Sequence, residues 1–136
     1  MLNLKGFDKV LAVLNERLRK YDSSIEVATT PEGTRFPLVV VTDIENQSVN
    51  RTYGGIESYS VLSIQVDIYA RQKTLKNVTY SGRNITRKIA REVDYILTEC
   101  GLKRTSSRAV QNADRSIDRY VMTYTVLQND NKNYFV

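Results

Sequence analysis

The sequence predicts an α+β fold in which a mainly antiparallel sheet carries two helices on one face. Two segments repeat apolar residues at steps of three and four, so each predicted helix has a single apolar stripe. Residues 59–71 alternate apolar and polar side chains with period two, as a half-buried strand does. Two helices with one stripe each need a shared apolar surface, and a sheet supplies it. We expect one domain over 1–136, in the order α-β-β-β-α-β-β, with its other sheet face half-solvated or covered by another subunit.

The first predicted helix covers residues 4–20. Its stripe consists of Phe7, Val10, Leu11, Leu14 and Leu18. The polar run Asp22-Ser23-Ser24 ends it, and a short strand is expected at 25–29. Pro31 and Gly33 then predict a turn, and Pro37 marks the start of the next strand.

Residues 38–45 predict a buried central strand, because Leu38–Val41 is the longest apolar run in the chain. A polar stretch over 46–57 follows, and it is either a long hairpin loop or two flaring strand extensions. It contains Arg51, Tyr53, Gly54 and Gly55. The next strand, 59–71, is expected to bury the face formed by Leu62, Ile64, Val66, Ile68 and Ala70.

The second predicted helix runs from Gly82 to Cys100. Ser81 is a candidate N-cap, and Gly101 stands where a helix-ending glycine is common. Its stripe consists of Ile85, Ile89, Val93, Ile96, Leu97 and Cys100. Two closing strands are expected at 102–110 and, more strongly patterned, at 117–127. Residues 129–136 are expected to form a flexible tail.

Composition excludes several classes of chemistry. The chain has 136 residues, of which 41% are hydrophobic and 26% charged, as in ordinary soluble domains. It contains no His, so Ser-His-Asp, Cys-His and His-based zinc sites are all excluded. A single Cys excludes an internal disulfide, and we interpret Cys100 as a packing residue.

The net charge of +5 allows contact with nucleic acid, with an acidic protein surface, or with neither. The N-terminus lacks the apolar stretch of a signal peptide, and no window approaches the ~18 apolar residues of a membrane span. These features predict a protein of the reducing cytoplasm with no membrane partner.

No enzyme motif is complete. Phosphate-binding and dinucleotide-binding glycine patterns are absent. Asp43, Glu45 and Asp67 lie on adjacent predicted strands, as the carboxylates of a metal-dependent nuclease would, but the lysine of that motif is missing. We expect these carboxylates on a solvated strand face, and we predict no catalytic residue, metal or cofactor.

Two regions are candidate assembly contacts instead. On the second helix, Arg83 and Arg87 have no acidic residue three or four positions away, whereas Arg91 is expected to pair with Asp94, and Lys88 with Glu92. An acidic partner would explain the two unpaired arginines, although a solvated face explains them as well.

The second candidate region is the polar stretch 46–57. It joins the two strongest strands, where a tight hairpin would need only about two to five residues. Gly54 and Gly55 permit unusual backbone angles, and Arg51 and Tyr53 are residue types favoured in interfaces. A hairpin without a partner is the alternative.

With these patterns in place, the chain resembles the tail terminator, or tail completion, proteins of long-tailed bacteriophages. The resemblance covers most of the chain. It rests on the opening helix, on Phe36–Val41, on Val61–Arg71 with the helix that follows, and on Arg119–Tyr124. These are patterns of apolar alternation rather than site motifs, so no site residue is carried over.

The resemblance implies a structural role without catalysis. Such proteins form a ring, usually a hexamer, at the head-proximal end of the tail tube. The ring stops tube polymerisation and presents a surface for head-tail joining, and DNA passes through without being recognised specifically. Implied partners are further copies of the chain, the tail tube protein, and a head-completion or connector protein. The implied location is the virion tail, after assembly in the host cytoplasm. Two alternatives remain: a head-closure or minor tail subunit, and a small basic nucleic-acid-binding domain.

Overall fold

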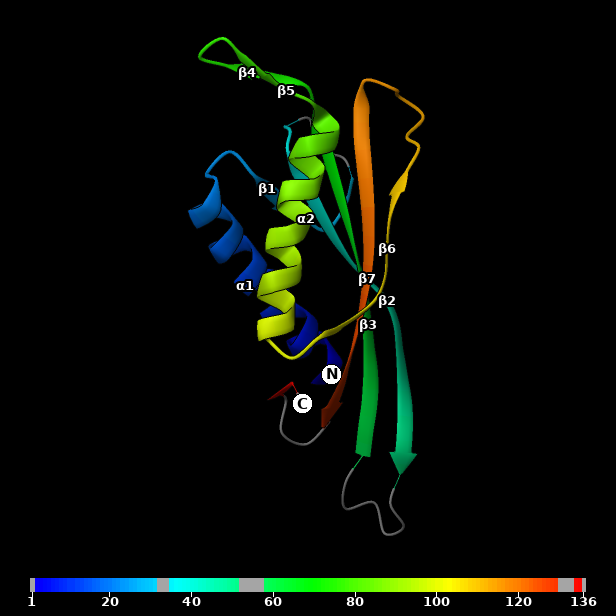
Figure 1. The fold of residues 1–136 in the computed structure, drawn as a ribbon. Coiled ribbons are helices and arrows are strands. Elements are labelled where there is room, and N and C mark those ends of the chain that lie inside the picture. The colour runs from blue at the N-terminus through cyan, green and yellow to red at the C-terminus, as the bar shows by residue number, and fades with distance from the viewer. Residues whose placement is uncertain (1, 32–34, 52–57, 130–133, 136) are drawn as a thin grey trace.

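The computed structural model describes residues 2–31, 35–51, 58–129 and 134–135, with side chains for 6–31, 35–44 and 61–127. Two helices, α1 (Leu2–Tyr21) and α2 (Gly82–Glu99), lie side by side on one face of a twisted sheet (Figure 1). The α+β class, the chain order and the placement of both helices on one face are as the sequence predicts.

The sheet is six-stranded, with the order β1-β2-β3-β7-β6 and a short β8 beside β7. Its strands are β1 (Glu26–Ala28), β2 (Leu38–Arg51), β3 (Ser58–Arg71), β6 (Lys103–Val110), β7 (Ile117–Asn129) and β8 (Tyr134–Phe135). The pairing of β1 with β2 is parallel, and every other strand pair in the described part of the sheet is antiparallel.

The main core lies between the helices and the facing side of the sheet. The predicted alternation in β3 is confirmed, since Leu62, Ile64, Val66, Ile68 and Ala70 are all fully buried. The first four of these pack against α1 and α2 in a cluster that includes Val10, Leu14, Leu18, Ile89, Val93, Ile96, Leu97 and Tyr124. Cys100 is half-buried at the margin of this cluster, and burial raises the pKa of its thiol.

Both predicted caps of α2 are present. The Ser81 hydroxyl accepts a 3.1 Å hydrogen bond from the backbone N–H of Asn84. At the other end, Gly101 has φ 96°, and the N–H of Leu102 donates to the carbonyl of Leu97. Glycine is needed at this left-handed position because a side chain would be strained there. The caps fix where α2 begins and ends on the sheet.

The first half of the polar stretch, residues 46–51, continues the sheet. Strand β2 runs on to Arg51, which pairs with Ser58 at the start of β3, so of the two alternatives the strand extensions are the right one. The expectation that all twelve residues form a loop is therefore wrong, while their role as a contact stays a prediction. The physical reason is that polar residues are compatible with a strand that projects beyond the core. Tyr53, Gly54 and Gly55 lie outside the described residues.

Between β3 and α2 the chain forms a hairpin that the sequence analysis missed. Strands β4 (Lys73–Leu75) and β5 (Val78–Tyr80) are joined through Lys76 and Asn77, which both have positive φ, at 50° and 66°. Two consecutive residues of this kind are typical of a type I′ hairpin turn. The hairpin projects beyond the start of α2 (Figure 1).

Candidate functional site

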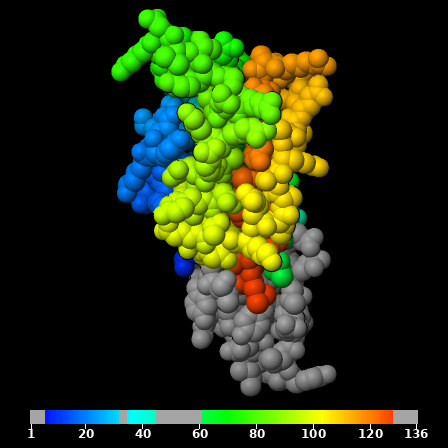
Figure 2. Space-filling view, in the orientation of Figure 1, coloured from blue at the N-terminus to red at the C-terminus, as the bar shows by residue number. Residues whose placement is uncertain are grey.

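A groove runs between α2 and the β6–β7 border of the sheet. Helix α2 packs mainly on β3 and β7, so β6 is left largely uncovered. In the space-filling view, atoms of β7 (orange) are visible between α2 (yellow-green) and β6 (amber) (Figure 2). The groove therefore has a helical wall, a wall formed by an edge strand, and a floor formed by β7.

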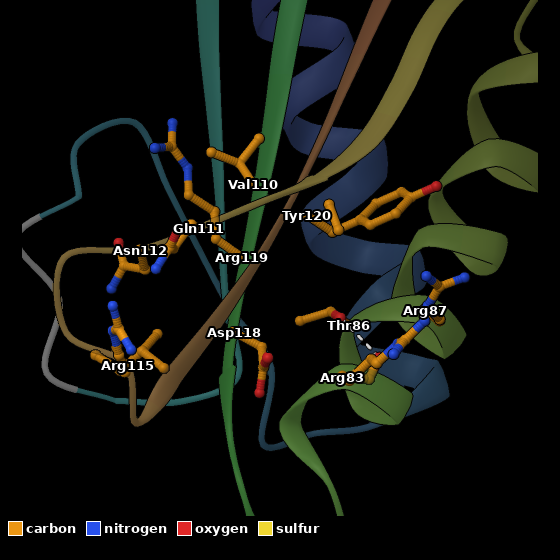
Figure 3. A pocket seen from close by; sticks show the side chains of 12 residues that line it. Arg83, Thr86, Arg87, Val110, Gln111, Asn112, Arg115, Asp118, Arg119 and Tyr120 are labelled. Atoms are coloured by element: carbon orange, nitrogen blue, oxygen red, sulfur yellow. Dashed lines mark hydrogen bonds between the residues drawn. The ribbon is translucent and has the colours of Figure 1, made fainter.

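Arg83 and Arg87, the arginines singled out from the sequence, both line this groove. The larger of its two cavities has a volume of about 420 Å³ and receives Asp118 and Tyr120 from β7 and Arg115 from the β6–β7 loop (Figure 3). A second cavity, of about 220 Å³, is also lined by Arg87 and Tyr120, so the two cavities adjoin. We call this combined feature the basic groove. Its arginines are Arg83, Arg87, Arg91, Arg104, Arg115 and Arg119.

The charges in the basic groove are only partly compensated. Arg83 and Arg87 have no carboxylate within 4.0 Å among the described side chains, although the Arg87 guanidinium lies 5.9 Å from the centre of the Tyr120 ring. Both arginines are exposed. The sequence predicts that these two arginines have no ion-pair partner within their own helix. The structure shows that none of the other described elements supplies one either.

The predicted pairs within α2 are wrong. Among the described side chains, Asp94 is paired with Arg104 of β6, at 3.5 Å, and Arg91 has no ion pair. Lys88 lies 5.5 Å from the ring centre of Tyr80 on the β4–β5 hairpin. Contacts with other elements replace the local pairs, which contribute only about 0.2–0.5 kcal/mol.

At the N-terminal end of α2, the chain packs closely against β3 and β7. A Cβ placed on Gly82 would overlap Oδ2 of Asp118 and would lie 2.8 Å from the carbonyl oxygen of Ala70. A carboxylate at a helix N-terminus is stabilised by the helix dipole. Gly82 is therefore required by this close approach, and Asp118 is the one acidic residue among the described residues that line the larger cavity.

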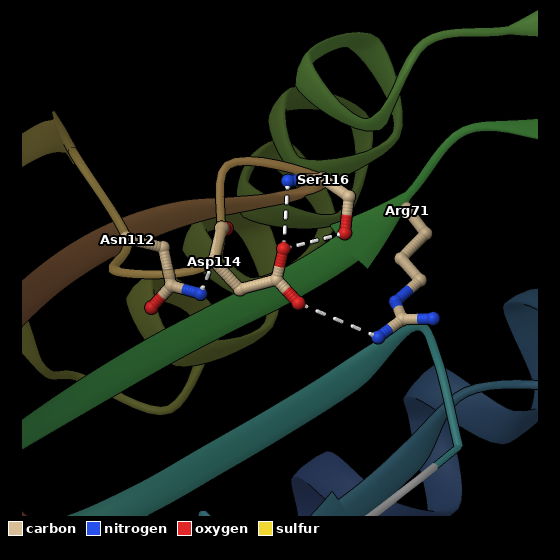
Figure 4. Close-up of polar contacts among 4 residues, drawn as sticks. All are labelled: Arg71, Asn112, Asp114 and Ser116. Atoms are coloured by element: carbon tan, nitrogen blue, oxygen red, sulfur yellow. Dashed lines mark hydrogen bonds and ion pairs between the residues drawn. The ribbon is translucent and has the colours of Figure 1, made fainter.

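The β6–β7 loop, which carries Arg115, is ordered by its own polar contacts. The Asp114 carboxylate accepts hydrogen bonds from the hydroxyl and the backbone N–H of Ser116, at 2.7 and 2.9 Å (Figure 4). These bonds, together with Arg71 at 3.7 Å, hold the pKa of Asp114 below its usual value. Arg115 thus projects from a loop with a defined geometry.

The sheet face away from the helices is less solvated than predicted. Asp67 is only 6% exposed; it accepts hydrogen bonds from Gln65 at 3.2 Å and lies 3.4 Å from a guanidinium nitrogen of Arg119. Three apolar residues on this face, Leu38, Val40 and Val121, are also buried. The expectation of a solvated carboxylate is therefore wrong for Asp67, because the ion pair to the neighbouring strand covers it.

The nuclease alternative fails on geometry. Asp43 pairs with Ile64, which faces the helices, whereas Asp67 pairs with Val40 on the opposite face. Carboxylates on opposite faces of a sheet cannot bind one metal ion.

Within the described residues, no group of three or more His, Cys, Asp or Glu side chains is arranged to hold a metal. No helix in the same residues is long and apolar enough to span a bilayer.

The two candidate contact regions lie at opposite ends of the sheet. Arg51 pairs with Ser58 at the first residue of β3, whereas α2 follows the last residue of β3 by way of the hairpin. Arg51 and Arg83 therefore do not form one site. Sequence reasoning also missed Arg104, Arg115 and Tyr120 as neighbours of Arg87, since no local spacing relates α2 to the strands that follow it.

Comparison with known proteins finds a solved structure with a similar fold. No protein-family model and no curated protein sequence matches the chain. A chain of the solved structure described as "Virion of native gene transfer agent (GTA) particle" is similar, with a TM-score of 0.52 and 10% identity. The match covers 85% of the present chain and 90% of that chain. At this identity the likeness shows the fold alone.

Proposed function

We propose that this chain is a structural subunit of a phage-like particle. The observation that carries the proposal is the shared fold with a chain of a gene transfer agent virion, which spans nearly the whole of both chains. The sequence patterns independently resemble phage tail terminators. Both point to an assembly role, and we propose no enzymatic activity.

The specific role that we propose is that of a tail terminator. The subunit forms a ring, a hexamer by analogy, on the head-proximal end of the tail tube, where it stops polymerisation and offers a surface for head-tail joining. Its partners are its own copies, the tube protein and a head-completion or connector protein, while DNA passes through without specific contacts. Assembly takes place in the host cytoplasm, and the finished protein resides in the virion.

The exposed, unpaired arginines of the basic groove support a protein contact with an acidic surface. Exposed charges are well solvated and cost the free subunit little, yet they can select and orient a partner of opposite sign. The end of the β2–β3 hairpin, which includes Arg51, is a second candidate contact, at the opposite end of the sheet.

The test is the mass and shape of the purified protein, alone and with tail tubes. A hexamer would have a mass of six times 15.6 kDa, about 94 kDa, and would be visible as a ring by electron microscopy. Addition to growing tubes should stop elongation and place a cap at one end. A protein that stays monomeric and leaves tube growth unchanged would contradict the proposal.

Two alternatives make different predictions. A head-closure or minor tail subunit would bind the connector or another tail component and would leave tube growth unaffected. A nucleic-acid-binding domain would use the basic groove on phosphates, so its affinity for DNA would fall steeply as salt rises, because phosphate contacts release counterions. Weak DNA binding together with a stable ring would favour the terminator role over the role of a nucleic-acid-binding domain.

A further inference from the structure

The basic groove runs along α2, and every cation in its described lining is an arginine. Arg83 lines the larger cavity, Arg91 the smaller one and Arg87 both, so the groove follows the helix (Figure 3). All three side chains are exposed, and none has a carboxylate within 4.0 Å among the described side chains. A guanidinium presents a planar fork of N–H donors that fits a carboxylate or a phosphate. The groove is therefore suited to a ligand with several oxyanions.

The spacing of these three arginines indicates the form of the ligand. They stand four residues apart, so successive ones are about 6 Å apart along the helix, which rises about 1.5 Å per residue. Along one face of an extended chain, alternate residues repeat every ~6.8 Å, at about 3.4 Å per residue. Over two intervals the repeats differ by only about 1–2 Å, which long side chains can absorb. Three acidic residues at alternate positions of an extended segment thus match the three arginines one to one.

The walls of the basic groove favour an extended segment over a helix. On the side of β6 that faces the helices stand Arg104, Ser107 and Ala109, of which only alanine is apolar. Met122 on the floor is 1% exposed, so little apolar surface is left for the apolar face of a partner helix. An extended chain also needs only about half the width of a helix, which is about 10–12 Å across.

A second copy of this chain does not supply such a segment. The sequence contains 15 acidic residues, but nowhere do three of them stand at alternate positions or at steps of four. Asp43 and Glu45 form one alternate pair without a third member. Glu92 and Asp94 form the other. The matching series of carboxylates therefore has to come from a different protein.

A single strand of nucleic acid would also bring oxyanions to the basic groove. Sites for single strands combine such charges with aromatic side chains on which successive bases stack. Among the residues that line the groove in the described part of the chain, Tyr120 is the one aromatic, and the Arg87 guanidinium lies 5.9 Å from its ring centre. With no second stacking platform in this lining, the groove favours carboxylates over a nucleic acid strand.

We propose that the basic groove binds an extended acidic segment of another protein of the particle, with carboxylates at three alternate positions meeting Arg83, Arg87 and Arg91 in turn. This inference rests on the proposed function, and it specifies the partner of the contact assigned to the groove. Asp94 opposes the segment little, because its carboxylate is already engaged by Tyr124 at 2.8 Å and by Arg104 at 3.5 Å.

The first test compares two fluorescent peptides of identical composition by anisotropy. In one peptide three aspartates alternate with serines, and in the other the three aspartates are consecutive. Both have the same net charge, so general attraction to a protein of net charge +5 is equal for the two. The alternating peptide should bind at least about tenfold more tightly, because only its carboxylates reach all three arginines, and its affinity should fall as salt rises. Equal affinities would overturn the proposal.

The second test removes the two ends of the arginine series. Arg83→Gln with Arg91→Gln should weaken binding of the alternating peptide at least about tenfold and abolish the preference for it. The matched control is Arg19→Gln with Arg108→Gln, which also removes two exposed arginines. Arg19 lies on α1, and Arg108 lies on the side of β6 that faces away from the helices, so the control should keep the preference. Unchanged denaturation midpoints would show that both variants fold.

Further outcomes separate this inference from the proposed function. Rings that cap tubes but show no preference for the alternating peptide would overturn the inference and leave the terminator role standing. A clear preference in a protein that forms no ring and caps no tube would overturn the terminator role and keep the groove as a site for an acidic segment. Tighter binding of single-stranded oligothymidine than of the alternating peptide would assign the groove to nucleic acid and overturn the inference.

Discussion

The hydroxyl of Tyr124 on β7 donates a 2.8 Å hydrogen bond to a carboxylate oxygen of Asp94 on α2. Arg104 on β6 approaches the same oxygen at 3.5 Å. Asp94 thereby connects the helix to two strands, at the point where the main core meets the basic groove. Tyr124 is one of the largest fully buried side chains in the described chain, and apart from a 3.5 Å contact with the sulfur of Met122, Asp94 is the partner that satisfies its hydroxyl.

Replacing Tyr124 with Phe should lower the free energy of unfolding by about 1–2 kcal/mol, because one hydrogen bond to a charged group is lost while the ring still fills its place. Tyr21→Phe, at a 48% exposed position, is the control and should change the stability little. Chemical denaturation measures both. If Tyr124→Phe is as stable as Tyr21→Phe, the hydrogen bond between Tyr124 and Asp94 contributes nothing to the free energy of unfolding.

The same residue predicts an alkaline loss of stability. Burial, and then the hydrogen bond to Asp94, raise the pKa of Tyr124 above its ordinary value of 10.0. Above pH 10 the unfolded chain therefore releases this proton while the folded chain retains it, so stability falls as pH rises. Tyr124→Phe should have a shallower decline above pH 10 than the parent protein, measured as denaturation midpoints between pH 8 and about 11. Parallel curves would contradict this.

Ile89 tests the packing of α2 on the sheet. It is 2% exposed within the core cluster, so Ile89→Ala should cost about 2–5 kcal/mol through lost burial and the cavity left behind. Arg91→Ala, at an exposed position on the same helix, should cost far less. If the two denaturation midpoints coincide, the side of α2 that faces the sheet has been assigned wrongly.

Gly82 tests the close approach at the start of α2. The added methyl of Gly82→Ala would meet both Asp118 and the carbonyl of Ala70, so we expect a loss of roughly 1–3 kcal/mol despite the better helix propensity of alanine. Adding Asp118→Ala removes the contact with the flexible side chain only. The remaining cost would then report on the Ala70 carbonyl, which cannot move without shifting β3.

Arg83 and Arg87 test the basic groove as a contact surface. The double change to Glu should leave folding intact, since both side chains are exposed and no described ion pair is lost, but it should weaken ring formation or tube capping at least about tenfold. Arg83→Lys with Arg87→Lys keeps the charge and should retain most of the assembly. Normal capping by the Glu variant would show that the two arginines are only solvated.

Several features of this protein were determined by the sequence locally. The alternation in 59–71 gave the buried face of β3, and the stripes of α1 and α2 gave the sides that pack on the sheet. Ser81 and Gly101 placed the ends of α2 correctly. Each of these patterns is set by backbone geometry within a few residues, so it can be recognised without knowing what lies across the sheet. Arg83 and Arg87 were found in the same way, from spacing along one helix.

Only the tertiary structure decided which elements became neighbours. It placed Arg104, Arg115 and Tyr120 in the same groove as Arg87. It also paired Asp94 with Arg104 and Tyr124, whereas the sequence predicts a pair between Asp94 and Arg91. It buried Asp67 beneath Arg119 and left β6 at the border of the sheet. Side-chain periodicity specifies which face of a strand is buried, but it carries no information about which strand lies alongside. That choice depends on pairing between distant segments, and it determines the partners of every charge in the candidate site.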